Sequence, residues 1–342
     1  MLPAKMRRNN NPFISILVSA LRDENVKVLN FLPLGAWRAD ALHLHWLEQI
    51  FWGRVAARSL AWARFRGTRL LSLARAMRLR GRRVVWTVHN LDPHEFSCKR
   101  QERIYSKFRD TLMPMITDVI CMSSEVEISV RERYPMLERA NFHIIPHPHY
   151  SKYFEDIDYC LPSEVADFIG NNDNIPNLTM IGMLRRYKGI PKLVNQLIAT
   201  KAEFRLVIAG SGSKKDVSEI RDAIGEDSRV KLLPRRVDEK ELVGLLKESD
   251  LAIFNFQKVL NSGSVLTALS LGTPVLAPRI GAIVDLEKQL SEPWLNTYES
   301  DELIERLSAV LRAHPDRAAR PDLSFCDPKH IAFQLKSVYS RP

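Results

Sequence analysis

Cysteine is scarce in this chain, and long apolar runs are absent. Its 342 residues include four cysteines, with no CxxC pair and no histidine at metal-binding spacing, which predicts reduced thiols, as in the cytoplasm, and no metal site. No window of about 18 uncharged apolar residues occurs, as a membrane-spanning helix requires, and no signal-peptide core is found. The sequence therefore predicts a protein that is not integral to a membrane.

Acidic residues are missing from a long segment of the first half. Residues 51–83 hold ten arginines and no Asp or Glu, interleaved with Phe51, Trp52, Trp62, Phe65 and Leu70. Residues 1–150 hold 24 Lys and Arg against 13 Asp and Glu, while the remainder holds 26 against 27. A basic amphipathic helix suits an anionic membrane surface, and a solvated face covered by long arginine stems is the alternative. No nucleic-acid motif accompanies the charge, so we expect no nucleic-acid partner.

Short apolar runs alternate with longer helical patterns along the whole chain, which predicts an α/β fold with parallel sheets. The predicted strands of the first half are 26–32, 41–45, 84–89, 118–122 and 142–146, and those of the second half are 177–182, 205–209, 230–233, 251–254, 275–277 and 295–298. The predicted helices are 12–21, 47–80, 98–113, 125–134, 190–198, 214–224, 238–249, 264–271, 301–313 and 328–339.

A polar passage with proline and asparagine, from about 150 to 176, separates the two halves. This favours two doubly wound, Rossmann-like domains that face a cleft, with ligands at the carboxyl ends of the strands. We expect an N-terminal domain over 1–155 and a C-terminal domain over 156–325. The last segment, at about 326–342, is expected to form a helix that crosses back to the first domain.

The stretch NSGSVLTALSLGTPVLAP (261–278) predicts an anion-binding helix start. Asn261, Ser262, Gly263 and Ser264 precede or open an apolar helical run. The first-turn N–H groups of a helix have no partner within the helix, a serine can cap them, and glycine allows close approach.

Cations follow the first strand of the second half. GMLRRYKG (182–189) places Arg185 and Lys188 just after a strand that ends at Gly182. Basic side chains at this edge, opposite a helix start, are suited to neutralise a diphosphate through charge-assisted hydrogen bonds. An exposed basic loop is the alternative.

The next two strands also end in residues suited to a nucleotide. One ends in the Gly-Ser-Gly turn that begins at Gly210, which lacks the GxGxxG spacing of a dinucleotide site. The other is followed by Arg236 and Val237, where backbone groups could meet a nucleobase.

Taken in order, these motifs resemble those of GT-B glycosyltransferases. More narrowly, the chain is similar to the bacterial exopolysaccharide β-mannosyltransferases of the xanthan type. The likeness covers most of the chain, in both expected domains, through the segments NPF (11–13), DALHLHWLE (40–48), VVWTVHNLDPHE (84–95), HYSKYF (149–154), GMLRRYKG (182–189) and the stretch 261–278.

The resemblance implies a GT-B fold and a hexosyltransferase that moves mannose from GDP-mannose, with inversion to a β-product, onto a polyprenyl-diphosphate-linked oligosaccharide in exopolysaccharide assembly. It implies a peripheral location on the inner face of the cytoplasmic membrane, and no need for a metal or another cofactor. The residues described above, which follow the strands of the second half and open the helix near 263, would then bind the nucleotide-sugar donor. The common retaining pattern has glutamates in the helix that begins near 263, whereas Asn261, Ser264 and Thr267 offer no carboxylate.

An inverting transfer requires a group that takes the proton of the acceptor hydroxyl. Glu95 is the preferred base, with Glu48 and Asp92 as alternatives, because all three follow predicted strands of the first half. His89 ends one of these strands and is expected to position the acceptor or the transferred sugar.

Seven of the nine histidines lie in residues 1–150, several of them at strand ends. We interpret His43 as a core or interface residue. Acceptor binding is assigned to Asn11, His45, Trp46, His94 and His149.

Other functions stay open. The same fold acting on a UDP-sugar, such as UDP-glucose or UDP-glucuronic acid, is the first alternative, because the motif at 182–188 recognises phosphate rather than the base. A GT-B-like nucleotide-sugar epimerase is the second, and a basic adaptor or nucleic-acid binder without enzymatic activity is the third.

Overall fold

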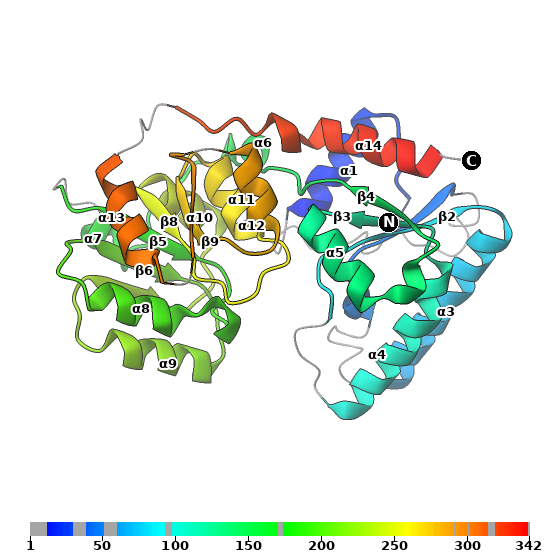
Figure 1. Ribbon diagram of the computed structural model, residues 1–342, viewed down its shortest axis with the longest axis horizontal. Coiled ribbons are helices and arrows are strands. Elements are labelled where there is room, and N and C mark those ends of the chain that lie inside the picture. The colour runs from blue at the N-terminus through cyan, green and yellow to red at the C-terminus, as the bar shows by residue number, and fades with distance from the viewer. Residues whose placement is uncertain are drawn as a thin grey trace. The chain divides into compact units, whose positions relative to one another are not determined.

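The computed structural model describes residues 12–29, 39–50, 60–92, 98–169, 174–290, 292–299, 301–313 and 319–340. The chain divides into two compact units (Figure 1). Unit 1 comprises Met1–Pro148 and Cys326–Pro342, and unit 2 comprises His149–Phe325. The boundary lies at 148 and 149 rather than at 155 and 156, because the Tyr150 N–H donates to Ser270 Oγ within unit 2.

Unit 1 contains a parallel sheet of four strands in the order β1-β2-β3-β4. These strands are β1 (Ala41–Leu44), β2 (Arg83–Thr87), β3 (Asp118–Cys121) and β4 (Asn141–Ile144). The helices of the unit are α1 (Phe13–Asp23), α3 (Leu60–Leu79), α4 (Lys99–Leu112), α5 (Ser124–Arg133) and α14 (Pro328–Ser340), with 3-10 turns at η1 (Leu47–Ile50), η2 (Met113–Met115) and η3 (Pro135–Leu137). The short turn η5 (Ser324–Cys326) precedes α14.

The last helix returns to the first unit, as expected. α14 packs against α1, and the two lie side by side in Figure 1. Its Tyr339 hydroxyl contacts His43 Nδ1 at 2.6 Å, and Lys336 Nζ lies 3.8 Å from Glu24 Oε2. His43 is therefore part of a partly buried polar contact between β1 and α14.

Two predicted elements of this unit differ from the structure. The strand predicted at 26–32 is wrong over 26–29, because these residues are not part of a strand and the Val26 N–H donates to Leu21 O at the end of α1. Residues 30–32 lie outside the described part. The helix predicted over 47–80 is observed as η1 and α3, and residues 51–59 between them are not described.

Unit 2 contains a parallel sheet of six strands in the order β10-β9-β8-β5-β6-β7. The strands are β5 (Asn177–Ile181), β6 (Arg205–Ala209), β7 (Val230–Leu233), β8 (Leu251–Ile253), β9 (Val275–Pro278) and β10 (Leu295–Tyr298). With β5 counted as the first strand, the order reads 3-2-1-4-5-6, in which the direction of winding reverses between β5 and β8. Ligands of doubly wound folds bind outside the carboxyl ends of the strands at this switch point.

The helices of unit 2 bury the two faces of this sheet (Figure 1). They are α6 (Ser151–Phe154), α7 (Ala166–Ile169), α8 (Ile190–Ile198), α9 (Lys214–Ile224), α10 (Glu239–Lys247), α11 (Gly263–Ser270), α12 (Ala282–Gln289) and α13 (Leu303–Ala313), with a 3-10 turn at η4 (Arg186–Lys188). Side chains cap several of them, as Asp238 and Glu241 do for α10 in a reciprocal capping box. In the part of the chain that the structure describes, no helix is both long and apolar enough to cross a bilayer.

Candidate functional site

The carboxyl ends of β5 and β6 approach each other through two glycines. Gly182 follows β5 with φ +107°, and Gly210 follows β6 with φ +157°. A Cβ atom on Gly210 would lie only 1.9 Å from the Gly182 carbonyl oxygen. Only glycine fits there, so the backbone at this edge of the sheet carries no side chain.

Lys188 is buried beside this edge. It ends the turn η4, its side chain points back to the strand, and its Nζ donates to Ile181 O at 3.2 Å. Nζ also lies 5.8 Å from the ring centroid of Phe256, which follows β8. The residue is only 5% exposed. Its ammonium group therefore lies buried at the switch point, beside the carboxyl end of β5 and the residues that follow β8.

The start of α11 reaches the same place. A Cβ atom on Gly182 would lie 2.6 Å from Lys188 Nζ and 3.0 Å from Ser264 Oγ, so both groups border the same point. Ser262 caps α11 by accepting from the Val265 N–H at 3.3 Å. The N–H groups at the first two positions of a helix have no acceptor within it, and in α11 these belong to Gly263 and Ser264.

No acid among the described residues balances the charge of Lys188. Burial, as the larger cause, and the positive charge of Arg185 together lower the pKa of Lys188 to about 8. No carboxylate of the described residues contributes to this pKa. A buried cation beside a second cation and a helix start is suited to bind an anion with at least two negative charges.

The remaining donor candidates have other surroundings. Asn261 is half-buried just before α11, whereas Arg236 is exposed and the Val237 side chain packs on the apolar cluster that contains Leu233 and Leu245. Their neighbour Arg235 is held by carboxylates of Glu164 and Glu241 at 2.7 Å. The structure therefore brings Gly182, Gly210, Lys188 and the start of α11 together, and leaves the nucleobase contact at 236–237 as a prediction.

The strand ends of unit 1 carry a cluster of histidines and aromatic rings. His45 follows β1 and His89 follows β2, and His45 Nδ1 lies 3.0 Å from His89 Nε2. Trp46 stacks on His89 with ring centroids 3.8 Å apart. Of the predicted acceptor residues, His45 and Trp46 thus lie beside His89. His149 belongs to unit 2, where its Nδ1 accepts from the Ser151 N–H at 3.2 Å, and Asn11 and His94 lie outside the described residues.

Glu48 is a buried carboxylate near this cluster. It lies in η1, is 6% exposed, and its Oε1 accepts from Asn90 Nδ2 at 3.0 Å. Burial raises the pKa of Glu48, although the hydrogen bonds from its own backbone and from Asn90 oppose this effect. A carboxyl group with a raised pKa is suited to proton transfer near neutral pH.

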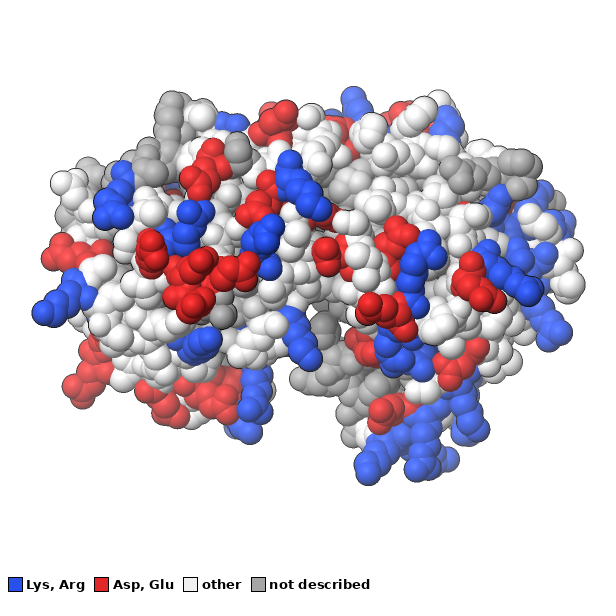
Figure 2. Space-filling view, in the orientation of Figure 1, with Lys and Arg blue, Asp and Glu red and all other residues white. Residues whose placement is uncertain are grey.

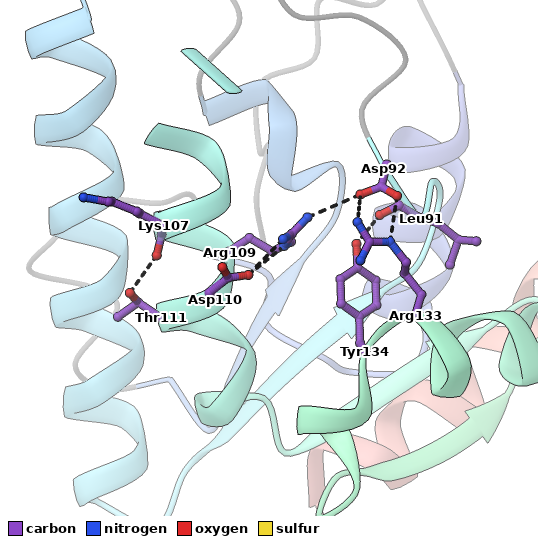
Figure 3. A network of polar contacts seen from close by, with 8 residues as sticks. All are labelled: Leu91, Asp92, Lys107, Arg109, Asp110, Thr111, Arg133 and Tyr134. Carbon is purple, nitrogen blue, oxygen red and sulfur yellow. Dashed lines mark hydrogen bonds and ion pairs between the residues drawn. The ribbon is translucent and has the colours of Figure 1, made fainter. Parts of the chain in front are cut away.

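Asp92 is held by two arginines (Figure 3). Arg133 Nε and Nη2 donate to its carboxylate at 2.9 and 3.0 Å, and Arg109 Nη1 does so at 3.3 Å. The Tyr134 hydroxyl donates to the neighbouring carbonyl of Leu91. These contacts tie the loop after β2 to α4 and α5, which favours a structural role for Asp92 over that of a base. Glu95, the preferred base, lies outside the described residues.

Known proteins match both units. Residues 175–313 match the family model described as glycosyl transferases group 1. The chain is 27% identical over 328 residues to a GDP-mannose:glycolipid 4-β-D-mannosyltransferase of Xanthomonas campestris pv. campestris, a match that covers 94% of this chain and 85% of the relative. The chain is a glycosyltransferase of the GT-B fold.

Solved structures agree on the fold of this glycosyltransferase. A glycosyltransferase from Rickettsia africae superimposes with a TM-score of 0.58 and 16% identity, covering 98% of this chain and 83% of the other. A sucrose-phosphate synthase from Thermosynechococcus elongatus gives a TM-score of 0.58 and 14% identity, covering 98% and 80%. At these identities the likeness concerns the fold alone.

Sequence reasoning missed several neighbours of these sites in the glycosyltransferase. The Tyr150 hydroxyl would lie 3.4 Å from a Cβ on Gly263, so it borders the start of α11, and Phe13 of α1 touches both His45 and His89. The spacing of His43 and His45 at the end of β1 was a usable signal for the histidine cluster, because residues two apart in extended chain share a face. The described residues contain no group of three or more His, Cys, Asp or Glu suited to a metal.

The lowered pKa of Lys188 predicts a pH-dependent affinity for nucleoside diphosphates. Bound phosphate favours the charged ammonium. The affinity should therefore be highest and independent of pH well below pH 8, since the pKa of Lys188 in the free protein is about 8. Above it, binding requires uptake of a proton, and Kd should approach a tenfold rise per pH unit. Calorimetric titration with GDP between pH 7 and 9 measures this, and a Kd that stays constant over this range would show that Lys188 does not bind the anion.

Proposed function

We propose that this glycosyltransferase moves mannose from GDP-mannose, with inversion to a β-product, onto a polyprenyl-diphosphate-linked oligosaccharide in exopolysaccharide assembly. The relative that matches 94% of the chain is named a GDP-mannose:glycolipid 4-β-D-mannosyltransferase, which supports this choice of donor and acceptor class. The proposed enzyme acts as a peripheral protein on the inner face of the cytoplasmic membrane and needs no metal.

The observation that carries the donor part is the buried charge of Lys188 at the switch point of unit 2, which no acid of the described segments balances. We assign the leaving diphosphate to Lys188, Arg185 and the first N–H groups of α11. Fixed donors and cations that meet the charge developed in a transition state take over the role that a metal plays elsewhere. The leaving group therefore gives no reason to require a divalent ion.

Inversion is supported by the side chains around the start of α11. Asn261 and Ser264 are not acids, and Thr267 donates its hydroxyl to the Gly263 carbonyl at 2.7 Å. We assign the base to a carboxylate of unit 1. Glu48 is the choice among the described residues because of its burial and raised pKa, and Glu95 is the alternative.

Membrane contact is assigned to the face of unit 1 formed by α3 and α4. Blue side chains gather over these helices in Figure 2. On α3, Trp62 and Phe65 are 43% and 48% exposed and stack with centroids 5.2 Å apart, and the Arg69 guanidinium lies 5.5 Å from the Phe65 ring. α3 contains no acidic residue. Exposed aromatic rings among arginines match the interface of an anionic bilayer.

Reversing three charges on α3 should release the protein from anionic vesicles. The variant carries Arg64→Glu, Arg66→Glu and Arg69→Glu, and each basic residue near an anionic surface contributes about 1 kcal/mol. We expect vesicle affinity to fall by about 100-fold or more. Co-sedimentation with phosphatidylglycerol vesicles measures the loss. The matched control reverses the charges of Lys214, Lys215 and Arg221 on the exposed side of α9 and should bind vesicles as the unmodified protein does. Equal binding of both variants would show that the basic face of α3 is solvated and does not contact the membrane.

Titration of the purified protein with GDP and UDP in EDTA tests the donor. GDP is expected to bind more tightly than UDP, and transfer from GDP-mannose to a glycolipid extract should survive EDTA. Tighter binding of UDP would replace the proposed donor with a UDP-sugar. Consumption of a nucleotide sugar without any acceptor would indicate an epimerase, and loss of transfer in EDTA would overturn metal independence.

A further inference from the structure

Two histidines at the strand ends of unit 1 share one proton position. His45 Nδ1 and His89 Nε2 are 3.0 Å apart, so one of these nitrogens donates and the other accepts. His45 is 2% exposed, and its second nitrogen, Nε2, is buried with no hydrogen-bond partner among the described residues. Buried polar atoms are nearly always paired, so this exception calls for an explanation.

The His89 ring is fixed from three sides. Trp46 stacks on its face at 3.8 Å with an interplanar angle of 15°, and Phe13 meets it edge-on at 4.9 Å and 86°. His45 fixes the third direction through the hydrogen bond. Trp46 reaches its position with φ +25°, a conformation that residues with a side chain rarely adopt and that is concentrated at functional sites.

Both histidines are neutral. Burial lowers the pKa of His45 and of His89 well below the usual value, and repulsion from His43 lowers that of His45 further, as repulsion from His45 does for His89. Each ring therefore carries a single N–H and a single lone pair. The position of the proton on one ring determines its position on the other, because the bond between them needs one donor and one acceptor.

The environment of His45 Nε2 decides between the two arrangements. If His89 donated through Nε2, the proton of His45 would sit on Nε2 as a buried N–H without an acceptor. If His45 donates through Nδ1, its Nε2 is a bare lone pair. Buried N–H groups without an acceptor are rarer in proteins than acceptors without a donor. The second arrangement is therefore favoured, and it leaves the proton of His89 on Nδ1.

We propose that His45 is a positioning residue that keeps the proton of His89 on Nδ1, so that His89 presents a neutral N–H donor to a sugar oxygen during transfer. In this arrangement the accepting lone pair of His89, on Nε2, is occupied by His45. His89 is therefore not the base, and the acceptor proton leaves to a carboxylate. The donor role rests on the glycosyl transfer proposed above, whereas the position of the proton does not.

Nitrogen NMR of the unmodified protein tests the proton positions. Long-range proton-nitrogen spectra of protein labelled with ¹⁵N-histidine distinguish the two neutral tautomers of each ring. At pH 7.5 we expect Nδ1–H on both His45 and His89. An Nε2–H signal from His89, or a doubly protonated ring, would overturn the proposal without any reference to enzymatic activity.

Two substitutions at His45 test the positioning role. His45→Asn keeps an N–H near the place of Nδ1 and removes Nε2, so kcat should stay within about threefold of the unmodified enzyme. His45→Leu cannot donate, and kcat should fall about tenfold or more, since a misplaced hydrogen-bond donor forfeits part of what such a group contributes. The Kd for GDP, which we assign to unit 2, should be unchanged in both.

The control is His330→Asn on the exposed side of α14, which should leave kcat and Kd unchanged. Equal losses in His45→Asn and His45→Leu would reduce His45 to a packing residue, and unchanged turnover in His45→Leu would remove its role in catalysis. If the unmodified protein transfers sugar from no nucleotide donor, the proposed function fails, and the NMR result still decides the tautomers.

Discussion

Replacing Lys188 with methionine is expected to weaken binding of GDP by roughly 2–5 kcal/mol, or about 30-fold to 5,000-fold, as when one partner of a buried charge pair is removed. The reason is that the diphosphate would lose the ammonium that lies beside Gly182 and Ser264. Methionine fills a similar volume without charge. Because Lys188 is a desolvated cation whose pKa is lowered in the free protein, the melting temperature should not fall.

Calorimetry with GDP and thermal unfolding without ligand measure the two quantities. The matched control is Lys192→Met, which removes an exposed lysine from α8 in the same unit and should change neither. A GDP affinity that is unaffected in Lys188→Met would refute the assignment of the diphosphate. A large fall in the melting temperature of the free protein would show instead that Lys188 is needed for folding.

Replacing Glu48 with glutamine is expected to lower kcat by about 100-fold to 10,000-fold, the usual contribution of a general base. Glutamine keeps an oxygen that accepts from Asn90 Nδ2, a bond of 3.0 Å in the present chain, but it cannot take a proton. Since burial raises the pKa of Glu48 and the base must be ionised, the rate of the unmodified enzyme should fall as the pH drops through that raised pKa. Steady-state turnover at saturating donor measures both effects.

Two further carboxylates serve as comparisons. Asp92→Asn should lower the melting temperature and change kcat little, because it loses the ion pairs with Arg133 and Arg109. Glu95→Gln tests the alternative base. Normal turnover in Glu48→Gln together with a loss of orders of magnitude in Glu95→Gln would transfer the role to Glu95.

Much of the fold could be predicted from local pattern. The strands β6, β7 and β10 were predicted with the observed bounds, because each is a short apolar run between polar turns, and buried parallel strands read this way. Local pattern failed at residues 26–29, where apolar side chains follow α1 but the Val26 amide closes the helix end instead of joining a sheet. Apolar character alone does not decide which partner a backbone N–H finds.

The candidate site was predictable by residue type and not by contact. The sequence indicated Gly182, Lys188 and Ser264 as strand-end and helix-start residues, which the α/β order brings to one edge of a sheet. It could not indicate that the Lys188 side chain turns back to the Ile181 carbonyl, nor that Asp92 forms ion pairs with arginines from α4 and α5. Such choices depend on side-chain packing between elements that are far apart in the sequence.

A crystal structure with bound GDP is the most direct test of the central claim. The account predicts the diphosphate at the switch point of unit 2, with its oxygens within hydrogen-bond distance of Lys188 Nζ and of an N–H group in the first turn of α11. GDP bound elsewhere, with Lys188 Nζ still directed only to the Ile181 carbonyl, would contradict it.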